Sequence, residues 1–305
     1  MTIENKILVT LDGSERAKRT IDYLCQFKPL MKNEVELFNI ATPVPEAYYD
    51  LKENPFSNSA VSRVKAWELG QKKKIEEFME EARMRLVSSG YASDGVHISL
   101  ASRKNGITRD ILTKIEKGYG ALVIRRRGSE NSLLGLTLGG VAAKLVDKAD
   151  GLPLIVAGGE PVQHALCIAV DGSEGAERAV RFVGRILRRT DCRVVLCSVL
   201  RALPFNVKEQ GTDPLASFAD QAFEAVEKAM DILVQSGVPE DRVEIKVVRE
   251  ANSRAGALVD VARETGCDTL VFGRKGLSLV ENFDLGRIPR KVIYGSRKLT
   301  VWIVP

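Results

Sequence analysis

Two short apolar runs in this chain end in the same four residues, aspartate, glycine, serine and glutamate. One set begins at Asp12 and the other at Asp171. These carboxylates are the chain's only evident candidates for a general base, because each follows a strand-like run and would stand at its end. Asp-Gly-Ser is also good turn chemistry, so the aspartate could simply begin a turn and cap the following helix. The pattern leaves both interpretations open.

Glycines recur at a fixed spacing after a later apolar run in the second half of the chain. Two residues separate Gly273 from Gly276, nine more follow, and then come Gly286 and Arg287. Glycine lets the backbone approach phosphate oxygens without an obstructing Cβ, and a helix N-terminus behind it offers N–H groups and a favourable dipole. These residue types suit an anion, although they would also serve a tight strand-to-helix connection. Arg287 could donate to a phosphate or fill its space.

The first half carries a weaker copy of this glycine pattern. Arg125 stands where the first glycine belongs, ten residues separate Gly128 from Gly139, and Gly140 takes the place of Arg287. The long side chain of Arg125 is expected to crowd any ligand bound there. We therefore expect the first copy of the loop to be degenerate.

Other chemistry is poorly represented in the sequence. The five cysteines form no CxxC pair and mostly lie in apolar stretches, and the two histidines, His97 and His164, are far apart. A zinc site or a histidine triad is therefore not expected, and no P-loop of the GxxxxGK[ST] type occurs. The net charge is +5, but no aromatic residues interleave with basic clusters such as 125–127. Such clusters favour a solvated or phosphate-facing rim over nucleic-acid binding.

The sequence also indicates where the protein works. Its first residues lack a basic segment followed by an apolar core, and its longest apolar runs, such as Leu152–Ala157, are only strand-sized. We therefore expect neither a secretory signal nor a membrane span, and a cytoplasmic protein.

The chain contains an internal repeat, and this repeat determines its domain organisation. Each copy has an apolar run, then Asp-Gly-Ser-Glu, and later a glycine loop, in the same order. A short linker that contains glycine and proline, residues 158–163, lies between the copies. We expect two domains, residues 1–158 and 164–305. The extra length of the first copy is expected mainly in the connection around 42–60. Within it, Pro43–Ser59 carries Tyr48, Tyr49 and Phe56, which could form a lid or a docking surface or pack back on the domain.

Strand-like and helix-like segments alternate within each copy. In the second copy Ser173 is a plausible N-cap, and the expected strands are 193–199, 243–248 and 269–272, with helices 176–187, 219–235, 254–264 and 289–294. The first copy contains a long charged helix over 62–87, with a solvated face. Such alternation predicts two doubly wound α/β domains, each with a parallel sheet and a ligand crevice beyond the carboxyl ends of its strands.

The chain resembles the universal stress protein family, once per repeat, in its Asp-Gly-Ser after the first strand and its Gly-x2-Gly-x9-Gly loop. The resemblance implies five-stranded sheets of order 3-2-1-4-5, as in the adenine nucleotide alpha hydrolase-like fold. It also implies that the two domains pair through their last strands as an internal, pseudo-two-fold dimer. Whether this pair associates further into a homodimer is left open.

Some members of that family bind ATP in this loop, and the resemblance assigns residues to such a site. In the second domain these are Asp171 and Val199 on the base side and Gly273, Gly276, Gly286 and Arg287 on the phosphate side. The weaker equivalents in the first domain are Asp12, Ile40, Gly128, Gly139 and Gly140. Magnesium could accompany the nucleotide.

Three functions follow from these expectations. The first is a stress-response regulatory protein that binds ATP or a related adenine nucleotide, chiefly in the second domain. The second is a nucleotide-independent protein-interaction module whose sites are closed or repurposed, as Arg125 and Arg287 suggest. The third, ranked last, is a slow ATPase or autokinase, so the enzyme question stays open.

Overall fold

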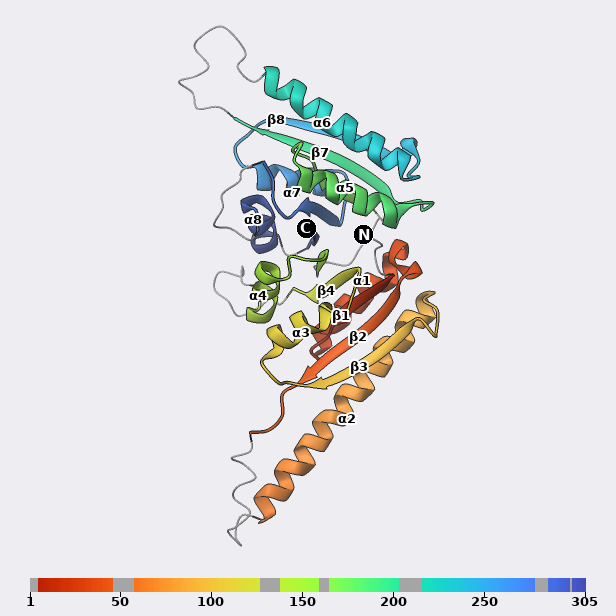
Figure 1. Cartoon of the computed structure of the whole chain (residues 1–305), viewed down its shortest axis with the longest axis vertical. Coiled ribbons are helices and arrows are strands. Elements are labelled where there is room, and N and C mark those ends of the chain that lie inside the picture. Colours follow the sequence, from red (N-terminus) through yellow and green to blue (C-terminus); the bar gives the residue numbers. More distant parts are fainter. Residues whose placement is uncertain are drawn as a thin grey trace.

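The computed structural model describes residues 5–45, 58–126, 138–158, 165–202, 216–277, 285–296 and 298–305. Strands and helices alternate within each half of the chain (Figure 1). The first half comprises β1 (Lys6–Thr10), α1 (Lys18–Gln26), β2 (Glu34–Ala41), α2 (Asn58–Ser89), β3 (Val96–Ser102), α3 (Ile107–Ile115), β4 (Ala121–Arg125), α4 (Gly140–Lys148) and β5 (Leu154–Ala157). The second comprises β6 (Ala165–Ala169), α5 (Glu174–Leu187), β7 (Arg193–Arg201), α6 (Ala216–Gln235), β8 (Val243–Ala251), α7 (Arg254–Glu264), β9 (Thr269–Gly273), α8 (Arg287–Gly295) and β10 (Thr300–Val304).

These strands form one continuous ten-stranded sheet of order β3-β2-β1-β4-β5-β10-β9-β6-β7-β8. The pairings within each half are parallel, whereas β5 and β10, the last strand of each half, run antiparallel to each other. Each half therefore has the expected order 3-2-1-4-5, and the expected pairing through the last strands is confirmed. In doubly wound sheets ligands bind beyond the carboxyl ends of the strands, and we call this end of the sheet the crevice of each half.

The strands are nearly continuous apolar runs because helices cover both faces of the sheet. One face packs against α1, α2, α5 and α6. The other face packs against α3, α4, α7 and α8. Side chains alternate between these cores, so that Ile7 and Val9 of β1 face the first and Leu8 faces the second.

The helix α2 accounts for most of the extra length of the first half. It has 32 residues, against 20 in the equivalent α6. The expectation that the extra residues lie mainly in the connection around 42–60 is therefore wrong, because the helix begins earlier than the pattern indicated. Pairs such as Lys72–Glu76 and Lys73–Glu77, each at 3.8 Å, confirm a solvated charged face. Residues 46–57 of the proposed lid lie outside the described residues.

A carboxylate inside the first half is held by three partners. Glu36 of β2 is only 6% exposed. Its oxygens lie 2.7 Å from Lys6 Nζ and 2.6 Å from Lys114 Nζ, and Tyr119 donates to it at 3.0 Å. Burial by itself would raise the pKa of Glu36, but the hydrogen bonds from Lys114, Lys6 and Tyr119 outweigh it and lower the pKa to about 2.

Replacing this carboxylate should destabilise the fold in a pH-dependent way. We expect Glu36→Gln to cost about 1–2 kcal/mol at pH 7, less than the loss of a fully enclosed ion pair, because Lys6 and Lys114 keep some access to solvent. The lowered pKa means that this stability is present above the ordinary value of 4.5 and is lost as the pH falls through about 2. Urea unfolding of parent and variant at pH 7 and pH 3 measures this, and a gap that does not shrink would contradict it.

Candidate functional site

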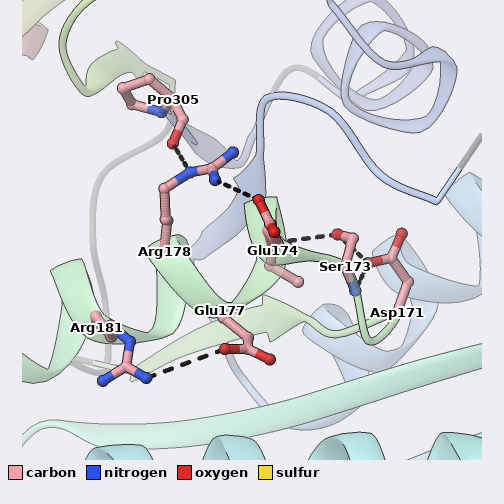
Figure 2. Close-up of polar contacts among 8 residues, drawn as sticks. Asp171, Ser173, Glu174, Glu177, Arg178, Arg181 and Pro305 are labelled. Carbon is pink, nitrogen blue, oxygen red and sulfur yellow. Dashed lines mark hydrogen bonds and ion pairs between the residues drawn. The ribbon is translucent and has the colours of Figure 1, made fainter. Parts of the chain in front are cut away.

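The turn after β6 holds one oxygen of the Asp171 carboxylate. Ser173 donates to Asp171 Oδ1 from its backbone N at 3.1 Å and from Oγ at 2.6 Å (Figure 2). The same hydroxyl accepts from Ala176 N at 3.2 Å, which confirms Ser173 as the N-cap of α5. The turn interpretation of Asp-Gly-Ser is thus correct as far as this oxygen is concerned.

The second oxygen of Asp171 faces the glycine loop. Leu277 N donates to Asp171 Oδ2 at 3.3 Å. A Cβ at Gly276 would stand 2.5 Å from that same oxygen. Glycine at 276 therefore lets the loop close over the carboxylate, and the structure brings together Asp171 and the loop as the sequence predicted.

Gly273 has a different reason to be glycine from the one expected. A Cβ there would lie 2.3 Å from the carbonyl carbon of Gly175 and 2.7 Å from Ala176 N. A Cβ at Gly175 would in turn lie 2.2 Å from the carbonyl oxygen of Lys275. The end of β9 and the first turn of α5 thus approach each other too closely for any side chain, so Gly273 packs against the chain itself. Gly175 was not among the residues predicted for the site, because its only signal in the sequence is a glycine directly after Asp-Gly-Ser-Glu.

Two helix N-termini reach this crevice, and they differ in charge. The first turns of α5 carry Glu174 and Glu177, which pair with Arg178 and Arg181 of the same helix (Figure 2). Arg178 also donates to the carbonyl of Pro305 at 2.7 Å. Since Ser173 already caps α5 and its first turn is acidic, this end is unsuited to an anion.

The N-terminus of α8 has the opposite character. Its N-cap is Gly286, which has no side chain to cap the helix, and its first turn contains no acidic residue. Gly286 N donates to Arg274 O at 2.9 Å, which fixes this helix end against the glycine loop. The amides of Arg287 and Ile288 precede the first intrahelical bond, and the Arg287 side chain is exposed. This end can therefore offer amides and a guanidinium to an anion.

The residues expected on the base side lie at the carboxyl ends of the second strands. Val199 of β7 and Ile40 of β2 are both partly buried. Leu11 N donates to Phe38 O and Val170 N to Cys197 O, so in each half the segment entering the aspartate turn stays bonded to this neighbouring strand. Val199 and Ile40 are thus near the ends where the aspartates stand.

The crevice of the first half is occupied by its own arginine. Arg125 Nη2 lies 2.8 Å from Asp12 Oδ2, and the Arg125 side chain is only 12% exposed. Burial alone would raise the pKa of Asp12, but hydrogen bonds from Ser14 and the charge of Arg125 outweigh it and lower the pKa. Arg125 therefore takes the position that a backbone amide takes in the second half. The expectation of a solvated or phosphate-facing rim is wrong for Arg125, because Asp12 holds it inward.

The rest of the first crevice also departs from the second. Ser14 makes no side-chain cap, and a 3-10 turn, Glu15–Ala17, precedes α1. Gly139 is the N-cap of α4, and Gly140 is the first residue of this helix. A Cβ at Gly140 would stand in open space. These two glycines match Gly286 and Arg287 in position, as predicted. Gly128 lies outside the described residues.

Other candidate chemistry is sparse in the described part of the chain. The cysteines 167, 192, 197 and 267 are buried in the core, in keeping with their expected role as small hydrophobes. Among the described residues, no group of three or more His, Cys, Asp or Glu side chains is arranged to hold a metal ion. No helix in the described ranges is both long and apolar enough to cross a bilayer.

Comparison with known proteins places these features in a family context. Residues 164–305 match the model of the universal stress protein family. A Staphylococcus haemolyticus protein named as a universal stress protein is 25% identical over 134 residues, covering 42% of this chain and 76% of that protein.

Solved structures match both halves. A universal stress protein from Archaeoglobus fulgidus aligns over 99% of this chain and 98% of its own, at 16% identity and a TM-score of 0.65. A structure from Pseudomonas aeruginosa, described by the same family name, aligns over 99% and 93%, at 16% identity and a TM-score of 0.56. These likenesses show that the fold, including its tandem arrangement, is shared along the whole chain.

Proposed function

We propose that this chain, whose residues 164–305 match the universal stress protein family and which shares the fold of a universal stress protein structure over 99% of its length, is a regulatory protein that binds an adenine nucleotide in its second half. The domains are residues 1–158 and 164–305. The observation that carries the proposal is the N-terminus of α8, whose N-cap is a glycine, whose first turn carries no acidic residue and which is fixed to the glycine loop beside Asp171. The resemblance to ATP-binding family members selects the nucleotide.

Each part of the second crevice has a place in this proposal. The phosphates would accept from the amides of Arg287 and Ile288 and from the Arg287 guanidinium. Asp171 and Val199 would face the base and ribose, and Gly276 keeps the loop low over the carboxylate. ATP is the first candidate, and Mg²⁺ would arrive with it. Two bonds from Ser173 fill Asp171 Oδ1, while Oδ2, which accepts from Leu277 N, can accept a second bond from the nucleotide, and no hydrolytic step is proposed.

The first half supports a different role. In the crevice of the first half, the Arg125 side chain fills the space beside Asp12. The equivalent space in the second half lies beside Asp171. We propose that this half binds no nucleotide and serves as the interaction half of the protein, in keeping with the alternative of a nucleotide-independent module. The expected stoichiometry is therefore one nucleotide per chain.

A matched pair of substitutions tests the site. Gly286 has φ −55° and ψ 148°, which an aspartate N-cap adopts normally, and its Cβ would stand 3.3 Å from Arg274 O, so a small local shift should let the variant fold. Its carboxylate would repel phosphate, and we expect Gly286→Asp to weaken Mg-ATP binding at least tenfold, about 1.4 kcal/mol. Isothermal titration calorimetry, backed by mass spectrometry of small molecules released on denaturation, measures this.

The control is the equivalent substitution in the first half. Gly139 has φ −59° and ψ 149° at the N-cap of α4. We expect Gly139→Asp to bind Mg-ATP as the parent does, because the first crevice is closed. Parent-like binding by Gly286→Asp would show that the site is assigned to the wrong place. No heat and no released nucleotide from the parent would support the nucleotide-independent alternative.

A further inference from the structure

Arg274 is a buried cation between the two halves of the protein. It is 5% exposed, and its guanidinium donates to three backbone carbonyls of the first half. Nη1 bonds Ala149 O at 2.9 Å, and Nη2 bonds Val146 O at 2.8 Å and Asp147 O at 2.6 Å. These carbonyls lie at the C-terminal end of α4, where a helix has unpaired acceptors and a negative dipole. The guanidinium is therefore a cap supplied by the other half.

The backbone of the same residue belongs to the candidate nucleotide loop. Arg274 follows Gly273, its N donates to Val304 O at 2.6 Å, and its O accepts from Gly286 N at 2.9 Å. Arg290 of α8 adds a second link, at 2.6 Å to the Asp147 carboxylate. A change in the loop or at the start of α8 would therefore act directly on the end of α4.

Within the described residues, the equivalent arginine of the first half makes no such contact with the second half. The residue equivalent to Arg274 in the first half is Arg126, which follows Arg125 at the end of β4. All three guanidinium nitrogens of Arg126 are buried and have no hydrogen-bond partner in the part of the chain that the structure describes. Burial lowers the pKa of Arg126 to about 10, so it still carries its charge at neutral pH. A symmetric connection would require both arginines to bond carbonyls of the opposite half. Within the described ranges only Arg274, in the second half, does so.

We propose that Arg274 is a positioning residue that couples occupancy of the second crevice to helix α4 of the first half. This inference rests on the proposed nucleotide binding. A phosphate held by α8 and the loop fixes the backbone of Arg274, and the guanidinium then holds the C-terminal end of α4. Because such coupling is reciprocal, loosening α4 must weaken nucleotide binding by the same factor. The C-terminal end of α4 in the first half thereby responds to whether a nucleotide is bound in the second half.

Hydrogen–deuterium exchange with and without Mg-ATP tests the coupling in the full chain. In the parent we expect slower exchange in two places, the second crevice (residues 273–277 and 286–290) and the end of α4 (residues 145–150). Arg274→Met keeps the bulk and removes the donors, so protection should remain in the crevice, vanish at α4, and accompany a Kd raised several-fold. Arg274→Lys should restore part of the α4 protection, and Arg126→Met, the control, should retain all of it.

The outcomes separate this inference from the proposed function. A parent that shows neither heat nor crevice protection overturns nucleotide binding and the coupling with it. Crevice protection without α4 protection overturns the coupling alone. Full α4 protection in Arg274→Met also overturns it, because another contact must then carry the effect. If Arg274→Met does not fold, the parent and Arg274→Lys still decide the question.

Discussion

Replacing Trp302 with alanine is expected to lower the free energy of unfolding by about 3–5 kcal/mol. Trp302 lies in β10 and is completely buried. Its ring meets Phe27 of the first half at 5.4 Å and Phe182 of the second at 5.9 Å, both edge-on. Its Nε1 donates to Tyr23 Oη of α1 at 2.9 Å. One side chain thus fills the core on both sides of the β5–β10 junction, and its removal leaves a cavity shared by the two halves.

Urea unfolding followed by circular dichroism measures the effect of this substitution. Trp67, the chain's other tryptophan, is 59% exposed on α2, and Trp67→Ala should change stability by no more than about 0.5 kcal/mol. Because the two halves share the Trp302 core, we expect the parent to unfold in one transition and Trp302→Ala to begin to separate the halves. A loss below about 1 kcal/mol would show that the junction does not depend on this ring.

The sequence predicted the fold well because its signals are local or repeated. Apolar runs ending in Asp-Gly-Ser locate the first strand of each half. Ser173 marks the start of α5, because its side chain caps the amide of Ala176, only three residues later in the sequence. Helix α7 has the predicted bounds, Arg254–Glu264. The β5–β10 pairing required the family resemblance, since nothing within either strand specifies its partner.

The roles of the arginines could not be predicted, because they depend on how the two halves meet. A cluster of basic residues at 125–127 looks like a solvated rim when only neighbours in sequence are considered. In the structure Arg125 reaches Asp12 in the turn after β1, and the guanidinium nitrogens of Arg126 are buried. Arg274 caps a helix that ends more than a hundred residues earlier in the chain. Such partners follow from tertiary packing, and the residue type alone fixes only the charge.

The reason for a glycine in the glycine loop likewise depends on tertiary packing. Gly273 was expected to be glycine for a phosphate, but its missing Cβ faces the backbone of Gly175 and Ala176. A methyl group there would meet atoms that cannot rotate away, so we expect Gly273→Ala to cost about 1–3 kcal/mol of stability. The first turn of α5 must shift, and Asp171 and Ser173 would shift with it. Chemical denaturation measures the stability.

The matched control separates this crowding from a general effect of glycine. Gly140 is the first residue of α4 and has nothing within 4 Å of its would-be Cβ. Gly140→Ala should therefore be neutral or stabilising by up to about 1 kcal/mol, because alanine restricts the unfolded chain and suits a helix. If Gly273→Ala proved as stable as Gly140→Ala, the close approach of β9 and α5 would not be what requires glycine at 273. A phosphate would then again be the better reason, and nucleotide affinity, rather than stability, would be the property that this substitution changes.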